Sequence, residues 1–430
     1  MPAPPTQSLI LTFENARRVV EQQASHVTPG EHETVDLLHS AGRILAEPLT
    51  ADRDLPPFPR ATRDGYAVRA SDLATLPGRL KVIGEIKAGH TEIPAALNRG
   101  ETFSIMTGAP VPQGADAVVM VEYTSQQDGL VEIKKGVTQR ENIVGRGAEA
   151  KRGDLVVGAG TRLNESAIAL AASVGKSKLK VFIRPRVAIL TTGDEIVAID
   201  SEPGATQIRN SNTYSLAVQV QRAGGNPVLL PIAPDEPRRL RQLIEQGLQS
   251  DLLIMTGGVS MGRYDLVEQV LADLQAEFFF TGAKIQPGKP VVFGRSSCGS
   301  GRLARSKAAA PASHKNSHIY FFGLPGNPVS TMVTFELFAR PMLEALAGMR
   351  ARPLTFLHAR LKSEIRVKTG LTRFLPAILS GEYQESRVEL VSWQGSGDVA
   401  ARARANCFIV IPPDRDHIPP GEWVALLPPL

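Results

Sequence analysis

The chain has 430 residues, of which 43% are hydrophobic and 21% are charged, so it has the composition of a globular protein long enough for more than one core. Its formal net charge is +5, but the Lys and Arg residues are dispersed among Asp and Glu, and aromatic residues make up 5%. Nucleic-acid binding usually needs a dense basic surface with stacking aromatics, so this composition argues against it.

The two cysteines, Cys298 and Cys407, lie far apart without a CxxC spacing, which argues against a structural zinc site and against a disulfide framework. Residues 1–11 lack the basic and apolar regions of a signal peptide. No stretch approaches the ~18 uninterrupted apolar residues of a transmembrane helix. We therefore expect a cytoplasmic protein without a membrane span.

In chain order, the first predicted element is a helix that begins after Thr12 and carries apolar residues at helical spacing. From about Ala51 the sequence changes to short β-rich runs separated by Gly and Pro, which predicts a small β domain. A helical pattern returns near Gly153 and includes a candidate cap at Asn164. We expect this short helix to pack against the first one, which makes the β segment an insertion.

Strands and amphipathic helices alternate from Arg186 to about Gly348, a pattern typical of a doubly wound sheet. Short β runs return after Arg352. Residues 295–317 are rich in Ser, Ala, Gly and basic residues, and they predict a flexible surface insert between two strands.

The predicted fold is an α/β core domain with a doubly wound, mostly parallel sheet, in a multidomain α+β chain with an inserted β domain and a C-terminal β domain. The predicted boundaries are 7–50 with 152–183 for a discontinuous first domain, 51–151 for the inserted β domain, 184–348 for the α/β domain and 349–430 for the C-terminal domain.

Three glycine-containing turns each follow a short apolar run that predicts a strand. They are Thr191–Glu195, Thr256–Gly262 and Leu324–Ser330. In an α/β sheet such turns place backbone N–H donors, hydroxyls and carboxylates at one edge, where these proteins bind ligands. The arrangement favours a phosphorylated or otherwise anionic small ligand.

Several charged residues near these turns allow two interpretations each. Asp194 and Glu195 either cap a helix or hold a divalent cation beside a phosphate. Asp235 and Asp265 lie near predicted helix starts, where a capping carboxylate is ordinary. The lysines of this region are either solvated or neutralise an anion, and these are Lys284 and Lys289.

Standard nucleotide and hydrolase signatures are not supported. Gly175-Lys176-Ser177 lacks the first glycine of a P-loop because Leu170 stands there, and no GxGxxG opens a helix after a strand. Gly258 to Gly262 has the letters of a nucleophile elbow around Ser260, but a hydrolase also needs Asp and His partners, and the histidines that follow are poorly placed.

Six motifs in order resemble those of the molybdopterin molybdenumtransferase family, the bacterial MoeA type that is also represented by the E domain of gephyrin. The motifs are Asp64–Val68, Ile105–Pro112 with Gly114–Val119, Thr192–Glu195, Gly257–Gly262, Pro287–Pro290 and Leu324–Ser330. The resemblance covers nearly the whole chain.

This resemblance implies an enzyme that inserts molybdate into the dithiolene of adenylylated molybdopterin and releases AMP with a divalent cation, usually Mg2+. It also implies a homodimer joined through the discontinuous first domain, with an active cleft between the α/β domain of one subunit and the inserted β domain of the other. Other proteins of molybdenum cofactor biosynthesis are candidate partners.

The resemblance also implies roles for individual residues. Asp64 and Thr107 would come from the partner subunit as catalytic residues. The catalytic residues of the cleft would be Glu195, Asp235, Asp265 and Lys289. Substrate would be bound by Thr192, Gly193, Gly257, Gly258, Ser260, Gly262, Lys284, Pro325, Gly326, Asn327 and Pro328. Our hypothesis is electrostatic: Asp194, Glu195 and Asp265 hold the cation, and Lys289 and Ser260 position molybdate.

The chain departs from the family pattern at three places. Gln286 stands where the family usually has Lys, Glu149 follows Ala148 where a Gly-Glu-Asp run is usual, and Arg63 precedes Asp64. Two other functions stay open, a molybdopterin adenylyltransferase and a non-catalytic scaffold. Val259 and Ser260 favour insertion over adenylylation, because the related adenylylating family tends to carry Gly-Gly-Thr-Gly at that turn.

Overall fold

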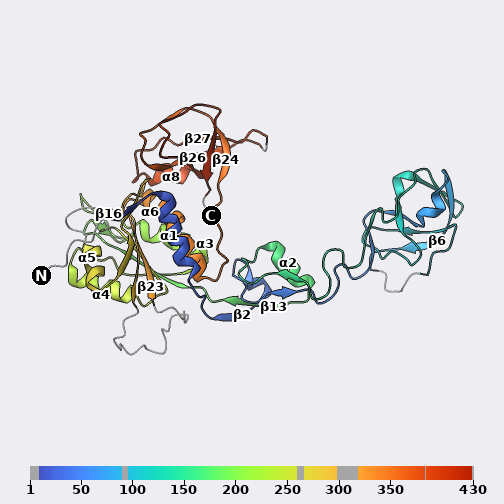
Figure 1. Ribbon diagram of the computed structural model, residues 1–430, viewed down its shortest axis with the longest axis horizontal. Coiled ribbons are helices and arrows are strands. Elements are labelled where there is room, and N and C mark those ends of the chain that lie inside the picture. Colours follow the sequence, from blue (N-terminus) through green and yellow to red (C-terminus); the bar gives the residue numbers. More distant parts are fainter. Residues whose placement is uncertain (1–8, 90–94, 259–265, 298–317, 383, 429–430) are drawn as a thin grey trace. The chain divides into compact units, whose positions relative to one another are not determined.

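The computed structural model describes residues 9–89, 95–258, 266–297, 318–382 and 384–428 (Figure 1). The chain forms two compact units. The first contains residues 1–46, 160–164 and 178–430, and the second contains residues 47–159 and 165–177. In sequence, the second unit therefore interrupts the first.

The centre of the first unit is a six-stranded sheet in the order β17-β14-β18-β23-β22-β19. Its strands are β14 (Arg186–Thr191), β17 (Asn226–Leu229), β18 (Leu252–Thr256), β19 (Glu277–Phe280), β22 (Val292–Ser297) and β23 (His318–Leu324). The pairings among β17, β14, β18 and β23 are parallel, whereas β22 runs antiparallel to both β23 and β19. The predicted strands of this region are thus present.

Helices cover both faces of this sheet, and the strands are apolar on both sides. Val187 and Ile189 pack in one core cluster, while Ala188 and Leu190, which alternate with them along β14, pack in another. Strands buried on both faces lose the polar alternation of a half-exposed strand, which is why these runs are almost continuously hydrophobic. The helices of this region are α3 (Asn212–Ala223), α4 (Pro237–Gly247), α5 (Leu266–Asp273), α6 (Pro328–Thr334) and α7 (Arg340–Leu346).

The first helix, α1 (Phe13–Ser25), begins where the sequence predicts it. The Thr12 hydroxyl accepts a hydrogen bond from the Asn15 N–H at 3.3 Å, which caps the helix. Its buried residues Ala16 and Val20 join the cluster that contains α6 and α7, and α1 contacts α7 directly. The expected partner, α2 (Glu165–Ser173), belongs to the second unit, so its packing against α1 stays a prediction. The apolar face of α1 is covered by η4 and α7, which come more than three hundred residues later in the sequence.

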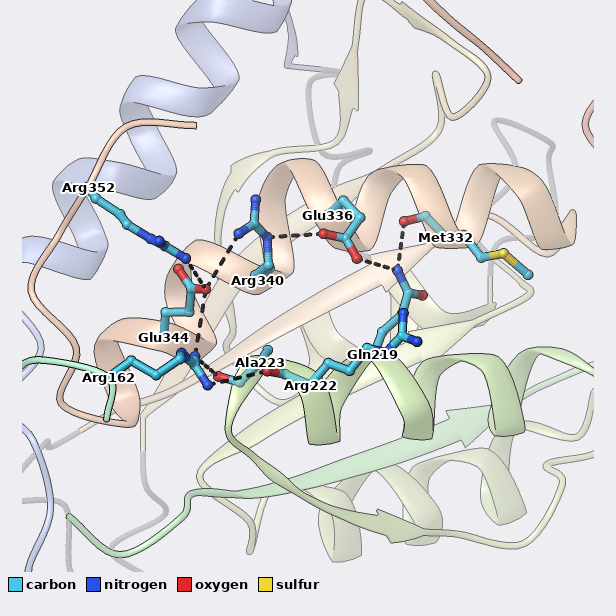
Figure 2. A network of polar contacts seen from close by, with 9 residues as sticks. All are labelled: Arg162, Gln219, Arg222, Ala223, Met332, Glu336, Arg340, Glu344 and Arg352. Carbon is cyan, nitrogen blue, oxygen red and sulfur yellow. Dashed lines mark hydrogen bonds and ion pairs between the residues drawn. The ribbon is translucent and has the colours of Figure 1, made fainter. Parts of the chain in front are cut away.

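A single turn of π-helix, η4 (Phe335–Ala339), lies between α6 and α7, and a buried polar network follows it (Figure 2). Gln219 on α3 donates to Glu336 at 2.9 Å and to the Met332 carbonyl at 3.1 Å. Glu336 also forms an ion pair with Arg340, at 3.1 Å between Oε2 and Nε. The network thus ties α3 to the helix that packs beside it.

Glu344 continues this network on the next helical turn. Its Oε1 lies 3.5 Å from Nη1 of Arg340, 3.3 Å from Nη2 of Arg352 and 3.8 Å from Nη2 of Arg162. Arg162 also donates to the Ala223 carbonyl at 2.9 Å, at the end of α3 (Figure 2). Buried carboxylates are tolerated only with such partners, because burial removes their hydration.

The C-terminal region forms a second six-stranded sheet, in the order β21-β26-β27-β24-β30-β28, and the additional pairing of β26 with β28 makes it barrel-like. The strands are β21 (Ile285–Gln286), β24 (Leu357–Leu361), β26 (Thr372–Ser380), β27 (Arg387–Leu390), β28 (Cys407–Ile411) and β30 (Trp423–Leu427), and α8 (Val399–Arg404) accompanies them. The Phe374 ring lies 5.3 Å from that of Phe13 on α1, which joins this region to the central core.

The second unit is built on a six-stranded sheet in the order β8-β5-β7-β6-β10-β9. These strands are β5 (Gly65–Val68), β6 (Gly78–Ile86), β7 (Glu101–Ile105), β8 (Ala117–Met120), β9 (Thr124–Gln127) and β10 (Leu130–Ile133). Each face carries its own apolar cluster, one around Phe103 and Ile105 and one around Tyr66 and Val131.

The remaining elements are short. They are β1 (Ile10–Leu11), β2 (His32–Asp36), η1 (Leu37–Ser40), β3 (Leu49–Thr50), β4 (Arg60–Ala61), η2 (Ala70–Leu73), η3 (Val121–Tyr123), β11 (Ile143–Val144), β12 (Leu155–Val157), β13 (Lys178–Phe182), β15 (Ile196–Val197), β16 (Ile208–Arg209), β20 (Gly282–Ala283), β25 (Ile365–Arg366) and β29 (His417–Ile418). Within the described ranges, no helix has the length and apolar character needed to cross a membrane.

The predicted start of the surface insert 295–317 is wrong, because it falls within strand β22. Arg295 lies on β22, where it pairs with Tyr320 of β23 and forms an ion pair with Glu277 at 2.6 Å. The strand therefore extends through Ser297, and the rest of the predicted insert, 298–317, lies outside the described residues.

Glu336→Ala tests whether the buried network holds the helices together. The substitution leaves the Arg340 guanidinium buried without that partner, so we expect a loss of about 3 kcal/mol in the free energy of unfolding. Glu245→Ala on α4 is the matched control, because Arg241 and Glu245 also form a pair one helical turn apart but are 46% and 49% exposed, against 9% and 6% for Arg340 and Glu336.

The control should lose less than about 0.5 kcal/mol. Denaturant unfolding followed by tryptophan fluorescence measures both variants, since the two tryptophans, Trp393 and Trp423, lie in the first unit. Equal losses in the two variants would show that the buried network adds nothing beyond an ordinary surface pair.

Candidate functional site

The three predicted turns meet at one edge of the central sheet. In the parallel register Thr191 pairs with Thr256, and Thr256 pairs with Leu324, so β14, β18 and β23 end side by side. The turns that follow these strands line a cavity of about 350 Å3, together with residues 208–212 and Pro290. The carboxyl ends of parallel strands are where α/β sheets hold ligands.

Gly257 and Gly258 let two of these turns approach closely. Both have positive φ, +88° and +62°, and a Cβ on Gly257 would lie 2.4 Å from the Thr192 carbonyl oxygen. A Cβ on Gly258 would lie 2.8 Å from the Thr192 hydroxyl. Side chains are therefore excluded at both positions, which leaves backbone groups facing the cavity.

A set of buried hydrogen bonds fixes the inner wall of the cavity. Asn212, the first residue of α3, donates from Nδ2 to the Thr256 hydroxyl at 3.0 Å and to the Gly326 carbonyl at 2.7 Å. The Thr256 hydroxyl in turn donates to the Pro325 carbonyl at 3.1 Å. One amide group thus joins α3 to the turns after β18 and β23.

A second set of hydrogen bonds fixes the end of β14. The Thr191 hydroxyl lies 2.7 Å from that of Thr213, and Asn210 Nδ2 donates to the same Thr213 hydroxyl at 2.9 Å. Asn210 Oδ1 accepts from the Thr213 N–H at 3.1 Å. The loop before α3 is therefore held against the strand by side chains that are fully paired.

The carboxylates Asp194, Glu195 and Asp235 lie together beside this edge. Asp194 Oδ1 accepts from the Asp235 N–H at 3.1 Å, and Glu195 and Asp235 line a second cavity of about 330 Å3 that shares Thr192 and Gly258 with the first. Desolvation raises the pKa of Asp235, and the negative charges of Asp194 and Glu195 raise it further. The cluster therefore favours a cation or a proton.

Carboxylate oxygens are the ligands that Mg2+ takes, so the chemistry of Asp194 and Glu195 fits that ion. Within the part of the chain that the structure describes, however, no group of at least three Asp, Glu, His or Cys side chains is close enough together to hold a metal. The third predicted ligand, Asp265, lies outside the described residues, as do Ser260 and Gly262.

The predicted lysines lie at the surface, and Lys289 directly precedes a residue that lines the cavity. Lys284 and Lys289 are exposed, and they flank the cis peptide bond between Gln286 and Pro287. Pro290, directly after Lys289, lines the first cavity. The turn therefore brings the Lys289 backbone next to the cavity wall.

Pro325, Gly326, Asn327 and Pro328 line the first cavity, as Thr192 does. The side chain of Asn327 also forms a hydrogen bond within the protein, in which its Nδ2 donates to the Ser396 hydroxyl at 2.8 Å. This bond, together with one from the Val329 N–H to the Ser396 carbonyl at 3.0 Å, ties the turn to the C-terminal sheet region.

Asp64 and Thr107 lie together in the second unit. Asp64 Oδ1 accepts from the Thr107 N–H at 2.6 Å and from its hydroxyl at 2.8 Å, and these bonds lower the pKa of Asp64. Of the departures noted in this region, Glu149 pairs with Arg60 at 2.7 Å, and Arg63 donates to the Thr62 carbonyl at 3.2 Å.

The sequence did not point to Asn210 or Asn212 as site residues, and it placed Thr256 in a ligand-binding turn without assigning a role to its hydroxyl. Asn residues just before or at the start of a helix are ordinary capping residues, so their type alone does not mark a site. What distinguishes Asn212 is its burial, at 7% exposed, and burial depends on strands distant in sequence.

Family comparisons agree with this architecture along the chain. Residues 11–175 match the MoeA N-terminal region (domains I and II), residues 188–345 match a probable molybdopterin binding domain, and residues 358–428 match the MoeA C-terminal region (domain IV). The matched regions coincide with the sheets described above.

The chain is also similar to individual proteins of this kind along most of its length. The chain is 33% identical over 92% of its length to the molybdopterin molybdenumtransferase of Nostoc sp., of which it covers 88%. It is 31% identical to that of Haemophilus influenzae, with 97% of this chain and 98% of that protein covered. Crystal structures of molybdopterin biosynthesis MoeA proteins from Pyrococcus horikoshii superpose with TM-scores of 0.72 and 0.66, at 26% and 33% identity, covering 97% of this chain and 99% of theirs.

The fold is therefore a multidomain, MoeA-like architecture with sheet-rich domains and a barrel-like C-terminal domain. The chain belongs to the molybdopterin molybdenumtransferase family, which confirms the family predicted from the six motifs.

Gly257→Ala tests the close approach of the turns. A left-handed backbone alone costs a non-glycine residue about 1–2 kcal/mol, and overpacking against Thr192 adds about 1–3 kcal/mol. Gly421→Ala isolates the first contribution, because Gly421 has a similar φ of +82° and nothing within 4 Å of its Cβ position. We expect Gly257→Ala to lower the free energy of unfolding by clearly more than Gly421→Ala, and equal losses would contradict the described contact.

Proposed function

We propose that this chain acts as a molybdopterin molybdenumtransferase, inserting molybdate into adenylylated molybdopterin and releasing AMP in molybdenum cofactor biosynthesis. The observation that carries the proposal is the meeting of three turns at the ends of β14, β18 and β23, around a cavity beside a carboxylate cluster. Relatives that align over most of the chain are named for this activity.

In this proposal the chain contributes binding, alignment and charge. Backbone N–H groups of the glycine turns face the phosphate groups of the substrate, and no side chain obstructs them at Gly257 and Gly258. Lys289 and Lys284 neutralise the molybdate oxyanion, and Ser260 helps to position it. Gln286 is uncharged, so the two lysines supply the positive charge at this turn. During transfer a water molecule attacks one phosphorus, the bond between the two phosphates is cleaved, and AMP leaves. The two dithiolene sulfurs replace two oxygens of molybdate as ligands of molybdenum, and these oxygens leave as water after taking up the thiol protons and protons from solvent.

We further propose that Asp194 and Glu195, with Asp265, hold Mg2+. A bound Mg2+ would screen the charge of the pyrophosphate. Desolvation is the main cause of the raised pKa of Asp235, and the negative charges of Asp194 and Glu195, which raise it further, support this assignment. In this proposal Asp235 is a catalytic residue that lies beside Asp194 and Glu195.

We also propose a cytoplasmic homodimer in which Asp64 and Thr107 of one subunit complete the cleft of the other. Their exposed, hydrogen-bonded pair supports a role toward an outside group. The predicted domains, 7–50 with 152–183, 51–151, 184–348 and 349–430, receive support from the regions that the family descriptions match.

For residues 184–348 we propose a doubly wound core. Its support is a strand order that changes direction at β14, with helices on both faces of the sheet. The cavity lies beside this change of direction, between the ends of β14 and β18.

Single-turnover release of AMP from adenylylated molybdopterin, with Mg2+ and with or without molybdate, tests the activity. We expect molybdate-dependent release that falls at least about 100-fold in Asp64→Ala and Glu195→Ala, in keeping with the loss of a group that stabilises charge in the transition state. Glu382→Ala, an exposed carboxylate of the C-terminal region, is the control and should release AMP at the wild-type rate. Tight substrate binding without release would favour the non-catalytic scaffold.

Mixing the two inactive variants tests the shared cleft. If Asp64 and Glu195 act from different subunits, a heterodimer of Asp64→Ala and Glu195→Ala has one intact site and one doubly altered site. Co-expression at equal levels should then restore about a quarter of the wild-type activity, since half of the dimers are mixed and each has one working site. No recovery in mixed dimers isolated with two different tags would place both residues in one subunit's site.

A further inference from the structure

Asn212 lines the first cavity and has an acceptor atom that no other described residue satisfies. Its Nδ2 must face the Gly326 carbonyl, which can only accept, and the Thr256 hydroxyl, whose hydrogen is given to Pro325. The orientation of the amide is thereby fixed, and Oδ1 points away from these partners. Among the described residues this buried Oδ1 has no hydrogen-bond partner.

A ligand that satisfies this atom must offer a hydrogen. Molybdate and the phosphates of a nucleotide present mainly acceptor oxygens with negative charge, so they would repel Oδ1 rather than bind it. An N–H or O–H group is the required chemistry. The acceptor therefore marks a part of the cavity that is unsuited to the anionic end of a ligand.

The surroundings of Asn212 lead to the same conclusion. The buried polar side chains of this cavity are uncharged, and they belong to Thr191, Thr192, Asn210, Asn212 and Thr256. Thr192 is 3% exposed, and its hydroxyl likewise lacks a partner among the described residues. The charged residues of the lining, Glu195 and Arg209, are exposed. The cavity thus separates a neutral polar interior from a charged rim.

We infer that Asn212 is a specificity-determining residue whose Oδ1 accepts a hydrogen bond from the exocyclic amino group of a pterin. This inference deepens the proposed function and rests on it for the identity of the ligand. A pterin is flat and uncharged and carries its amino group on one edge, which suits a neutral interior. The phosphate-bearing end of the substrate then lies toward the charged rim and the glycine turns.

A ribose hydroxyl offers the same donor chemistry, but the ribose of a nucleotide is joined directly to a charged phosphate. Placing it at Asn212 would bring that charge into the neutral interior, at a cost that no buried cation among the described lining residues offsets. The lining therefore favours a flat, uncharged ring with an amino group over a ribose. Adenine shares these features with a pterin, and the measurement of AMP binding separates the two.

Binding of paired small probes tests this assignment without requiring catalysis. Free pterin and lumazine differ in that lumazine has a carbonyl oxygen in place of the exocyclic amino group. We expect the wild-type protein to bind pterin about tenfold more tightly than lumazine, the size expected for one hydrogen bond with a buried acceptor. In Asn212→Ala this preference should disappear, while the Kd for AMP should change less than about twofold.

Asn210→Ala is the matched control, since Asn210 is equally buried at 7% exposed but has both amide atoms paired within the protein. It should keep the preference for pterin even if its stability falls, which separates a ligand contact from local disruption. The inference is overturned if wild-type protein binds pterin and lumazine alike, if Asn212→Ala keeps the preference, or if it weakens AMP instead of pterin. These experiments measure binding and do not depend on catalysis. A protein that fails to release AMP could therefore still confirm or contradict the role of Asn212.

Discussion

The parallel register of β14, β18 and β23 is the constraint on which the rest of the site depends. Because Thr191, Thr256 and Leu324 lie in register, the chain must turn at the same edge after each strand. Backbone groups that would otherwise be scattered over more than a hundred residues of sequence are thereby concentrated around one cavity. Glycine at the closest approach and an amide side chain across the strand ends complete the arrangement.

The buried network behind the sheet supports the same geometry from the other side. Asn212 stands at the beginning of α3, and Gln219, two turns later, holds that helix to Glu336. The helix carrying Glu336 begins at Pro328, in the turn that lines the cavity. Burying charged groups in a core costs free energy because they lose their hydration. What the network contributes is directional contacts between the helices, which apolar packing cannot supply. One helix pair thus connects the core to the wall of the site.

Much of this fold could be predicted from local pattern. Continuous apolar runs predicted β14, β18 and β23, the Thr12 cap predicted the start of α1, and the glycine turns predicted the edge of the sheet where the cavity lies. The pairing of α1 with α7 could not be predicted, because apolar spacing says that a face is buried but not by which segment. The role of Asn212 could not be predicted for a related reason: its oxygen lacks a partner among the described residues only because three segments distant in sequence come together around it. The extra residues of β22 resemble a polar loop in sequence and become a strand through pairing with β23.

The interruption of the first unit by the second also sets an order of events during synthesis. Residues 47–177 hold all of the second unit, so its sequence is complete before β13, the partner of β2, has been made. Domains generally fold as units while the chain is still growing. The N-terminal segment therefore remains without its partners until β13, and much later α7, have been synthesised. The apolar face of α1, with Ala16 and Val20, is among the first parts of the core to be synthesised and among the last to be covered.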